Sequence, residues 1–205
     1  MLECFTFVPK LYFGSNTYIL HSNGEYCVID PSVSYTAVSE KLGDIAKCVK
    51  YIILTHCHFD HIFTLDEWIE KTCITPIMSP EASENIKSSY VNCYSSILGS
   101  NKSYLGSSYT VFDNDTLPFA DTNLQFIMTP GHTDGSLSVL VGGYAFVGDT
   151  LFAGGSYGRY DLPTGDRDAL KNSIARILAL DPNIKIMPGH GEPTTVIDAI
   201  GSRYL

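Results

Sequence analysis

The strongest constraint on this chain is a run of four potential metal ligands within six residues. Residues 50–54 (KYIIL) are apolar and β-branched enough to form a buried strand, and the sequence His56-Cys57-His58-Phe59-Asp60-His61 follows almost at once. Successive side chains of an extended segment alternate, so His56, His58 and Asp60 project to one side, and Cys57 and Phe59 to the other. The fold must therefore hold a ligand-rich face at the end of a buried strand, with Cys57 packed inside rather than coordinating.

Three further candidate ligands lie in loops that also follow predicted strands. His132 and His190 each end a Pro-Gly-His tripeptide, and Asp149 follows the apolar stretch 144–147. Any one of them alone is commonly a polar loop or turn residue. Four ligands in the first loop exceed what one tetrahedral cation takes from a single segment, whereas two neighbouring divalent cations could share all seven residues. His21 lies outside these loops, and we expect it to be structural or on the surface.

Strand-like and helix-like stretches are both present, which is typical of a mixed α/β domain. Strands are expected at residues 16–21, 26–29, 50–54, 124–128, 137–141, 144–147 and 184–187, and helices at residues 35–42 and about 168–180. Asp30-Pro31 stops the second strand, and Gly142-Gly143 forms a hairpin turn. The repeated Pro-Gly-His loops hint that the two halves of the chain are built alike.

Two segments near the ligands are expected to be helical in whole or in part. Ile62, Leu65, Trp68 and Ile69 recur at helical spacing, so His61 should begin the turn into a helix. Residues 79–123 are rich in Ser, Tyr and Asn with little alternation, apart from a helix start at Ser79-Pro80-Glu81. We expect this second segment to be a partly helical insert near the site.

Composition limits the class of partner and the compartment. With 22 acidic and 13 basic side chains the formal charge is −9, which argues against a nucleic-acid partner. Six scattered cysteines without a C-x-x-C pair favour reduced thiols in a cytoplasmic protein. The sequence shows neither a signal peptide nor an apolar run of membrane-spanning length. We expect one cytoplasmic domain over residues 1–205 that acts on a small-molecule substrate without a membrane partner, and its oligomeric state stays open.

One rival motif points to a different hydrolase chemistry. Residues 154–158 match G-x-S-x-G, and Asp168 and His190 follow in the order of an α/β-hydrolase triad. A nucleophile elbow needs a helix to start at once, yet Pro163 and Gly165 interrupt the following segment. The motif is therefore expected to be a loop that borders the substrate pocket.

The chain resembles the metallo-β-lactamase superfamily in four motifs: His56-x-His58-x-Asp60-His61, Gly131-His132, Gly148-Asp149 and Gly189-His190. Residues 131–136 (GHTDGS), 148–166 (GDTLFAGGSYGRYDLPTGD) and 188–195 (PGHGEPTT) are similar to the short hydroxyacylglutathione hydrolase (glyoxalase II-like) branch. The resemblance implies an αββα sandwich, two mixed β-sheets flanked by helices, with metals at one edge. It also implies that His56, His58 and His132 bind one metal, that Asp60, His61 and His190 bind the other, and that Asp149 bridges them.

Two departures from that branch concern the substrate. Long glyoxalase II enzymes carry a C-terminal helical domain that supplies much of the glutathione site, and this chain ends about ten residues after Thr195. The final stretch VIDAIGSRYL also lacks the Asn-Pro ending of many short relatives. We expect no C-terminal glutathione-binding helical domain, so the thiol carrier of the substrate stays open.

The expected chemistry is hydrolysis by a metal-activated water. Two cations that share a water lower its pKa from about 15.7 to near 7, and Asp60 could help to orient it as the catalytic residue. A thiolate leaves without a strong general acid, because its conjugate acid has a pKa of about 8.5, and this favours thioesters such as S-lactoylglutathione over amides. Arg159, Tyr157 and Tyr160 are candidates for binding the substrate, but Arg159 could instead form a salt bridge to Asp161.

Other functions could use the same residues. An iron persulfide dioxygenase keeps the histidine cluster but uses one iron, on His56, His58 and a ligand such as Asp149. A hydrolase could also act on other activated esters or lactones, and a non-catalytic metal-stabilised module would have no activity. Imidazole and carboxylate ligands suit zinc, iron and manganese. We expect two divalent metal ions, and zinc is the metal that we expect by default.

Overall fold

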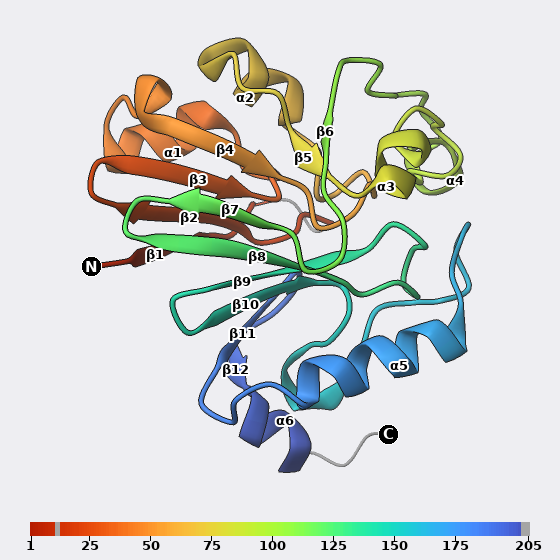
Figure 1. Ribbon diagram of the computed structural model, residues 1–205. Coiled ribbons are helices and arrows are strands. Elements are labelled where there is room, and N and C mark those ends of the chain that lie inside the picture. Colours follow the sequence, from red (N-terminus) through yellow and green to blue (C-terminus); the bar gives the residue numbers. More distant parts are fainter. Residues whose placement is uncertain (11–12, 202–205) are drawn as a thin grey trace.

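Two six-stranded β-sheets pack face to face, and helices cover the outer face of each sheet (Figure 1). The computed structural model describes residues 1–10 and 13–201. Both sheets mix parallel and antiparallel pairs, so the αββα sandwich expected from the sequence is confirmed. In this described part of the chain, no helix is long and apolar enough to cross a membrane.

The first half of the chain forms the first sheet, in the order β1-β2-β3-β4-β5-β6. Its strands are β1 (Glu3–Phe7), β2 (Thr17–Ser22), β3 (Glu25–Ile29), β4 (Val49–Ile53), β5 (Ile77–Met78) and β6 (Tyr109–Thr110). The first three form an antiparallel meander, and the next three add in parallel. Helix α1 (Tyr35–Leu42) and a 3-10 turn (Ala46–Cys48) connect β3 to β4. Helices α2 (Leu65–Thr72), α3 (Pro80–Asn85) and α4 (Tyr94–Leu98) follow.

The second half repeats this plan in the second sheet, in the order β12-β11-β10-β9-β8-β7. Its strands are β7 (Thr116–Phe119), β8 (Thr122–Met128), β9 (Leu137–Val141), β10 (Tyr144–Gly148), β11 (Lys185–Pro188) and β12 (Thr194–Thr195). β7 to β10 form an antiparallel meander, and α5 (Arg167–Leu178) then crosses over to β11, which is parallel to β10. Helix α6 (Val196–Gly201) comes last. The halves share an antiparallel meander followed by a helical crossover to a parallel strand. The paired Pro-Gly-His loops do not report this likeness, because both follow strands of the second sheet.

Alternating side chains build three apolar layers. In β2 and β3, Tyr18 and Ile29 point into the layer between the two sheets, whereas Val28 points outward under the helices of the first half. In β10, Phe146 points between the sheets and Val147 packs outward under α5 and α6. Since each sheet is covered on both faces, its central strands are apolar on both faces, and burial fixes their register.

Most of the expected elements are confirmed to within one or two residues at their ends. α1 has the bounds that the sequence predicts, Gly142-Gly143 turns between β9 and β10, and Asp30 follows the last residue of β3. The expected helix at the first ligand loop begins later than predicted. Helix α2 starts at Leu65, because His61 and Ile62 close single turns back to His58 and Phe59 instead of entering a continuous helix.

The insert at residues 79–123 is only partly what the sequence predicts. Ser79 caps α3 by accepting from the backbone N–H of Ala82, and α4 adds a second short helix. The segment also contains β6 and β7, which the sequence does not predict. β7 forms a hairpin with β8, in which Ala120 takes a positive φ of 49°. A four-residue edge strand alternates too weakly to show a periodic pattern, which explains the difference.

Candidate metal centre

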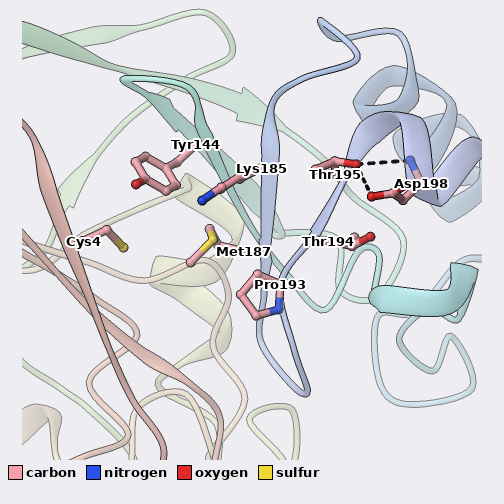
Figure 2. A pocket seen from close by; sticks show the side chains of 8 residues that line it. All are labelled: Cys4, Tyr144, Lys185, Met187, Pro193, Thr194, Thr195 and Asp198. Atoms are coloured by element: carbon pink, nitrogen blue, oxygen red, sulfur yellow. Dashed lines mark hydrogen bonds between the residues drawn. The ribbon is translucent and has the colours of Figure 1, made fainter.

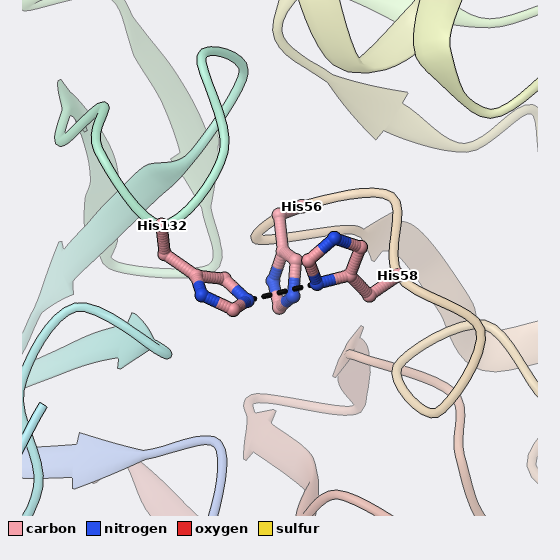
Figure 3. Close-up of side chains that lie close together, drawn as sticks. All are labelled: His56, His58 and His132. Carbon is pink, nitrogen blue, oxygen red and sulfur yellow. Dashed lines mark hydrogen bonds between the residues drawn. The ribbon is translucent and has the colours of Figure 1, made fainter. Parts of the chain in front are cut away.

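Loops that leave four strands bring the seven candidate ligands together at one edge of the sandwich. Among the described residues, three overlapping groups hold ligand atoms within 4.8 Å of one another: His56, His58 and His132; His56, His61 and Asp149; and Asp60, His61 and His190. Figure 3 shows the first group, in which His56 and His58 come from the loop after β4 and His132 comes from the loop after β8. His58 and His132, 74 positions apart in the sequence, thus meet with Nδ1 of one 2.8 Å from Nε2 of the other.

Asp149 lies between the groups. Its Oδ1 is 3.2 Å from Nε2 of His61, and its Oδ2 is 3.6 Å from Nε2 of His132 and 3.5 Å from Nε2 of His190. Asp60 lies next to His190, with its Oδ2 3.0 Å from Nε2 of that ring. One carboxylate therefore faces histidines of both outer groups, which is the position of a bridging ligand.

Hydrogen bonds on the far side of three rings turn their Nε2 atoms toward the centre. Nδ1 of His132 donates to the carbonyl oxygen of Arg159 at 2.6 Å, and Nδ1 of His61 lies 2.8 Å from Oδ2 of Asp30. Nδ1 of His56 lies 3.2 Å from Oγ1 of Thr55, whose hydroxyl donates to Asp30 at 2.7 Å. A ring that donates from Nδ1 keeps its Nε2 lone pair for a metal, and such partners orient metal-ligating histidines.

The residues present fit a metal. Four buried side-chain atoms make no hydrogen bond: Nε2 of His56, His58 and His61, and Oδ1 of Asp149. Buried polar atoms normally have partners, because an unpaired one costs about 1–3 kcal/mol. All four belong to residues of the ligand groups, and imidazole nitrogen with carboxylate oxygen is a donor set for zinc, iron or manganese.

The electrostatics divide the site. Burial, with His132 beside it, lowers the pKa of His58 to about 3, and burial holds the pKa of His56 well below its usual value. Burial also opposes charge on His61 and His190, but carboxylates outweigh it there. Asp30 and Asp149 hold the pKa of His61 well above its usual value, and hydrogen bonds to Asp149 and Asp60 raise the pKa of His190 to about 9. The carboxylate side of the site therefore attracts positive charge.

Two glycines let the backbone approach the ligands. A Cβ on Gly189 would lie 2.2 Å from Oδ1 of Asp149 and 2.6 Å from Cε1 of His61. A Cβ on Gly158 would lie 2.2 Å from the carbonyl oxygen of Asp149 and 2.8 Å from Nδ1 of His132. No side chain larger than hydrogen fits at either position without moving a ligand, which is a common reason for glycine at a site.

The residues between the ligands pack as predicted. Cys57 and Phe59 are buried in the apolar layer under the helices of the first half, whereas His56 and His58 face the site. The alternation continues although β4 ends at Ile53, so the ligands lie on a loop beyond the strand. His21, as expected, plays a structural part, with Nδ1 2.7 Å from Glu3.

A cavity of about 420 Å³ opens over the ligands, and the loop after β10 forms one wall. Tyr157 and Arg159 line it, but Tyr160 is not among its described lining residues and instead stacks on Tyr157 with ring centroids 6.5 Å apart. The guanidinium of Arg159 donates two hydrogen bonds to Asp161, at 2.9 and 2.8 Å. Arg159 thus forms the salt bridge weighed as the alternative to substrate binding.

The rival triad does not assemble. Ser156 follows a 3-10 turn (Ala153–Gly155), and no helix begins between that turn and α5, which starts at Arg167. Ser156 is exposed, and its hydroxyl donates to the carbonyl oxygen of Ala153 at 3.5 Å. Asp168 is exposed in the first turn of α5, where Lys171 is its partner. His190 lies instead among the carboxylates of the candidate ligands.

Cavity size alone would not locate the site. A second pocket of about 450 Å³ lies between β1 and the strands β10 to β12, and Figure 2 shows Cys4, Tyr144 and Lys185 on its walls. The hydroxyl of Thr195 donates to Asp198 there at 2.6 Å. None of the seven candidate ligands lines this pocket, and its described lining holds no group of buried, unpaired ligand atoms.

Several residues of the site have no signal in the sequence. The sequence predicts only a strand stop at Asp30, yet its buried carboxylate, at a positive φ of 52°, orients His61 and Thr55. The amide of Asn16 donates to the carbonyl oxygens of Pro188 and Gly191 and so fixes the His190 loop. The Asp-Pro pair and an Asn before a strand are too common to indicate such roles.

Comparison with known proteins agrees with this geometry. The family model described as "Metallo-beta-lactamase superfamily" matches residues 12–190. The chain belongs to the metallo-beta-lactamase superfamily. Within it, the chain is a metallo-hydrolase. A protein of Methanocaldococcus jannaschii named a probable metallo-hydrolase is 35% identical over 195 residues, which cover 88% of this chain and 89% of the relative. A Haemophilus influenzae protein named hydroxyacylglutathione hydrolase GloC is 27% identical, over 92% of this chain and 91% of its own length.

Solved structures share the fold over nearly the full chain. The B3 metallo-beta-lactamase BLEG-1 has a TM-score of 0.87 at 27% identity, with 98% of this chain and 97% of that one covered. A protein solved in a di-iron-bound form has a TM-score of 0.83 at 26% identity, with 97% and 98% covered. Proteins that carry different names are thus similar to this chain to a comparable degree, with sequence identities of 26% to 35%.

Proposed function

We propose that this protein is a dinuclear metal-dependent hydrolase of thioesters, with hydroxyacyl thioesters such as S-lactoylglutathione as the reference substrates. The observation that carries the proposal is the position of Asp149, whose two oxygens face His61 on one side and His132 and His190 on the other. A single tetrahedral site would leave part of this seven-residue set without a purpose.

In this proposal the seven residues serve two cations. His56, His58 and His132 would hold one divalent cation, Asp60, His61 and His190 the other, and Asp149 would contact both. When bound, the cations supply a water nucleophile acidic enough to ionise near pH 7 and a Lewis acid for the carbonyl of the substrate. Asp60, which is buried and lines the cavity, would help to orient that water and would accept its proton.

Thioesters suit the side chains around the cavity. Apart from the ligands, the titratable groups in its described lining are Cys93, Tyr157 and Arg159. Burial raises the pKa of Cys93, and Arg159 is bound to Asp161. Neither Cys93 nor Arg159 is a good general acid for a leaving amine, which leaves Tyr157 alone for that role, whereas a thiolate leaves without a general acid. The relative named hydroxyacylglutathione hydrolase supports thioesters, and we propose zinc as the resident metal, with iron or manganese as substitutes.

The test is hydrolysis of S-D-lactoylglutathione by protein loaded with two equivalents of zinc, beside Asp60→Asn. Asp168→Asn is the matched control, because it removes an exposed carboxylate outside the site and also disables the rival triad. We expect turnover in the wild type and in Asp168→Asn, and a loss of at least about a hundredfold in Asp60→Asn. Equal activity of Asp60→Asn and the wild type would refute the proposal.

Metal analysis and two further substrates separate the alternatives. One iron per chain, with oxygen-dependent formation of sulfite from glutathione persulfide, would identify a persulfide dioxygenase instead. Turnover of a β-lactam above that of every thioester would favour the activity named for one of the similar structures. Absence of turnover on thioesters, esters and lactones, in protein shown to hold two metals, would contradict the hydrolase assignment.

A further inference from the structure

The cavity over the ligands has an apolar wall. Its carbon-rich side chains are Phe13, Phe59, Ile97, Phe152, Tyr157 and Leu162. Phe13 is 55% exposed and Ile97 is 41% exposed, although large apolar side chains are usually covered. Exposed apolar residues gathered around one concave site mark a ligand-binding surface.

Four separate segments build this wall, and one of them is the first ligand loop, which contributes Phe59. Phe13 precedes β2, Ile97 lies on α4 of the insert, and Phe152 and Leu162 lie on the loop after β10. The wall reaches the ligands, because the ring of Phe152 packs edge-on against the ring of His190 with centroids 6.0 Å apart. A substrate whose reacting carbonyl lies over the ligands would therefore place its attached chain against apolar side chains.

The same cavity offers little to an anionic carrier. Arg159 is the only Lys or Arg among its described lining residues, and both of its hydrogen bonds from the guanidinium go to Asp161. In the insert, the ammonium of Lys102 lies 3.0 Å from Asp66. Glutathione has two carboxylates. In this cavity they would lie beside acidic ligands, in a chain with a formal charge of −9, while the nearby guanidinium and ammonium groups are already paired with Asp161 and Asp66.

We propose that the substrate is an uncharged ester or thioester whose apolar acyl chain lies along this wall, and that it is not a glutathione conjugate. This inference rests on the proposed hydrolase function and narrows its substrate class. Water adds its oxygen to the acyl carbon, and the bond from that carbon to the sulfur of a thioester, or to the alkoxy oxygen of an ester, breaks. The products are a carboxylate, a thiol or an alcohol, and one proton. The acyl chain takes no part in the bond changes and contributes binding alone.

The experiment compares kcat/KM of the zinc-loaded protein for the acetyl, butanoyl and hexanoyl thioesters of N-acetylcysteamine, an uncharged carrier, and for S-D-lactoylglutathione. Each methylene that leaves water for an apolar surface contributes about threefold to fourfold. Since the wall is partly open, we expect hexanoyl to exceed acetyl by at least about tenfold. We also expect the hexanoyl thioester to exceed lactoylglutathione.

Matched variants tie the preference to the wall. Ile97→Ser should lower the ratio of hexanoyl to acetyl turnover by about fivefold or more. Ile197→Ser makes the same change at an isoleucine that is 59% exposed on α6, outside the cavity, and should leave the ratio unchanged. A ratio that moves equally in both variants would contradict the role of the wall.

The outcomes separate this inference from the function on which it rests. A kcat/KM that rises with chain length in the wild type, together with a hexanoyl-to-acetyl ratio that falls in Ile97→Ser, supports both. Turnover that is greatest with lactoylglutathione, or independent of chain length, overturns the apolar acyl chain and leaves the hydrolase standing. No turnover with any of the four substrates overturns both.

Discussion

The carboxylate of Asp30 lies 2.8 Å from Nδ1 of His61, and neither side chain has appreciable contact with solvent. Oδ1 of the same carboxylate accepts the backbone N–H of Thr55, and Oδ2 accepts its hydroxyl, which in turn lies beside His56. One aspartate at the end of β3 thus orients a histidine from each of the proposed metal groups.

We therefore expect Asp30→Asn to weaken metal binding without unfolding the chain. Asparagine tolerates the positive φ of 52° at this position, but it does not supply the charge that holds Nδ1 of His61 protonated. Zinc affinity should fall by about 10–100-fold, measured by competition with a chromophoric chelator. Asp44→Asn, which removes a carboxylate bonded to Tyr35 away from the site, is the control, and an equal loss there would contradict the prediction.

Removal of the metals should lower the thermal stability. Free metal at a concentration of about a thousand times its dissociation constant stabilises the native state by about 4 kcal/mol. Each kcal/mol moves the Tm of a chain of this size by about 2–4 °C. Chelation should therefore lower the Tm by about 8–16 °C and abolish activity, and zinc should restore both. A Tm that is insensitive to chelation would show that the unpaired atoms of His56, His58, His61 and Asp149 do not bind metal.

Much of the site is predictable from the sequence because its ligands either cluster in one short segment or follow predicted strands. The first four lie within six residues, and the others directly follow strands whose carboxyl ends meet at one edge of a sheet. The central strands β2, β3, β4, β9, β10 and β11 are predictable because burial on both faces makes them largely apolar. β8 is predictable because its apolar residues alternate with polar ones.

What the sequence does not predict depends on contacts between distant segments. β1 escapes prediction, because as a half-exposed edge strand it lacks a clear pattern and is defined by its pairing with β2. The roles of Asp30 and Asn16 depend on where the His61 and His190 loops lie in the folded chain. No local sequence pattern predicts these positions. The partner of Arg159 is likewise open in the sequence, since only the folded loop shows that Asp161 binds it.

Gly189→Ala should disrupt the metal site more than the fold. The new Cβ would lie 2.2 Å from Oδ1 of Asp149, so that carboxylate or His61 must move. We expect loss of at least one metal per chain and a loss of activity of about a hundredfold or more, since small displacements of reacting groups have effects of this size. Metal content and thioester turnover are the measurements.

Gly191→Ala is the control for that change. Gly191 has a φ of +76°, so alanine there costs about 1 kcal/mol in backbone strain, but no atom lies within 4 Å of its Cβ. We expect a lower Tm with metal content unchanged. If Gly191→Ala lost as much metal as Gly189→Ala, loop strain rather than crowding of Asp149 would explain both results.

The salt bridge between Arg159 and Asp161 provides a way to change the charge that a substrate meets. Both side chains are more than half exposed, so the pair contributes about 0–1 kcal/mol to stability, and Asp161→Asn should leave the Tm nearly unchanged. The freed guanidinium would lie at the rim of the cavity, where it can bind a carboxylate. We expect kcat/KM for lactoylglutathione to rise up to about fivefold relative to an uncharged thioester, and added salt to reduce the gain. In the double variant with Arg159→Gln the gain should disappear; if it persists, the loop itself, rather than the freed charge, has changed the cavity.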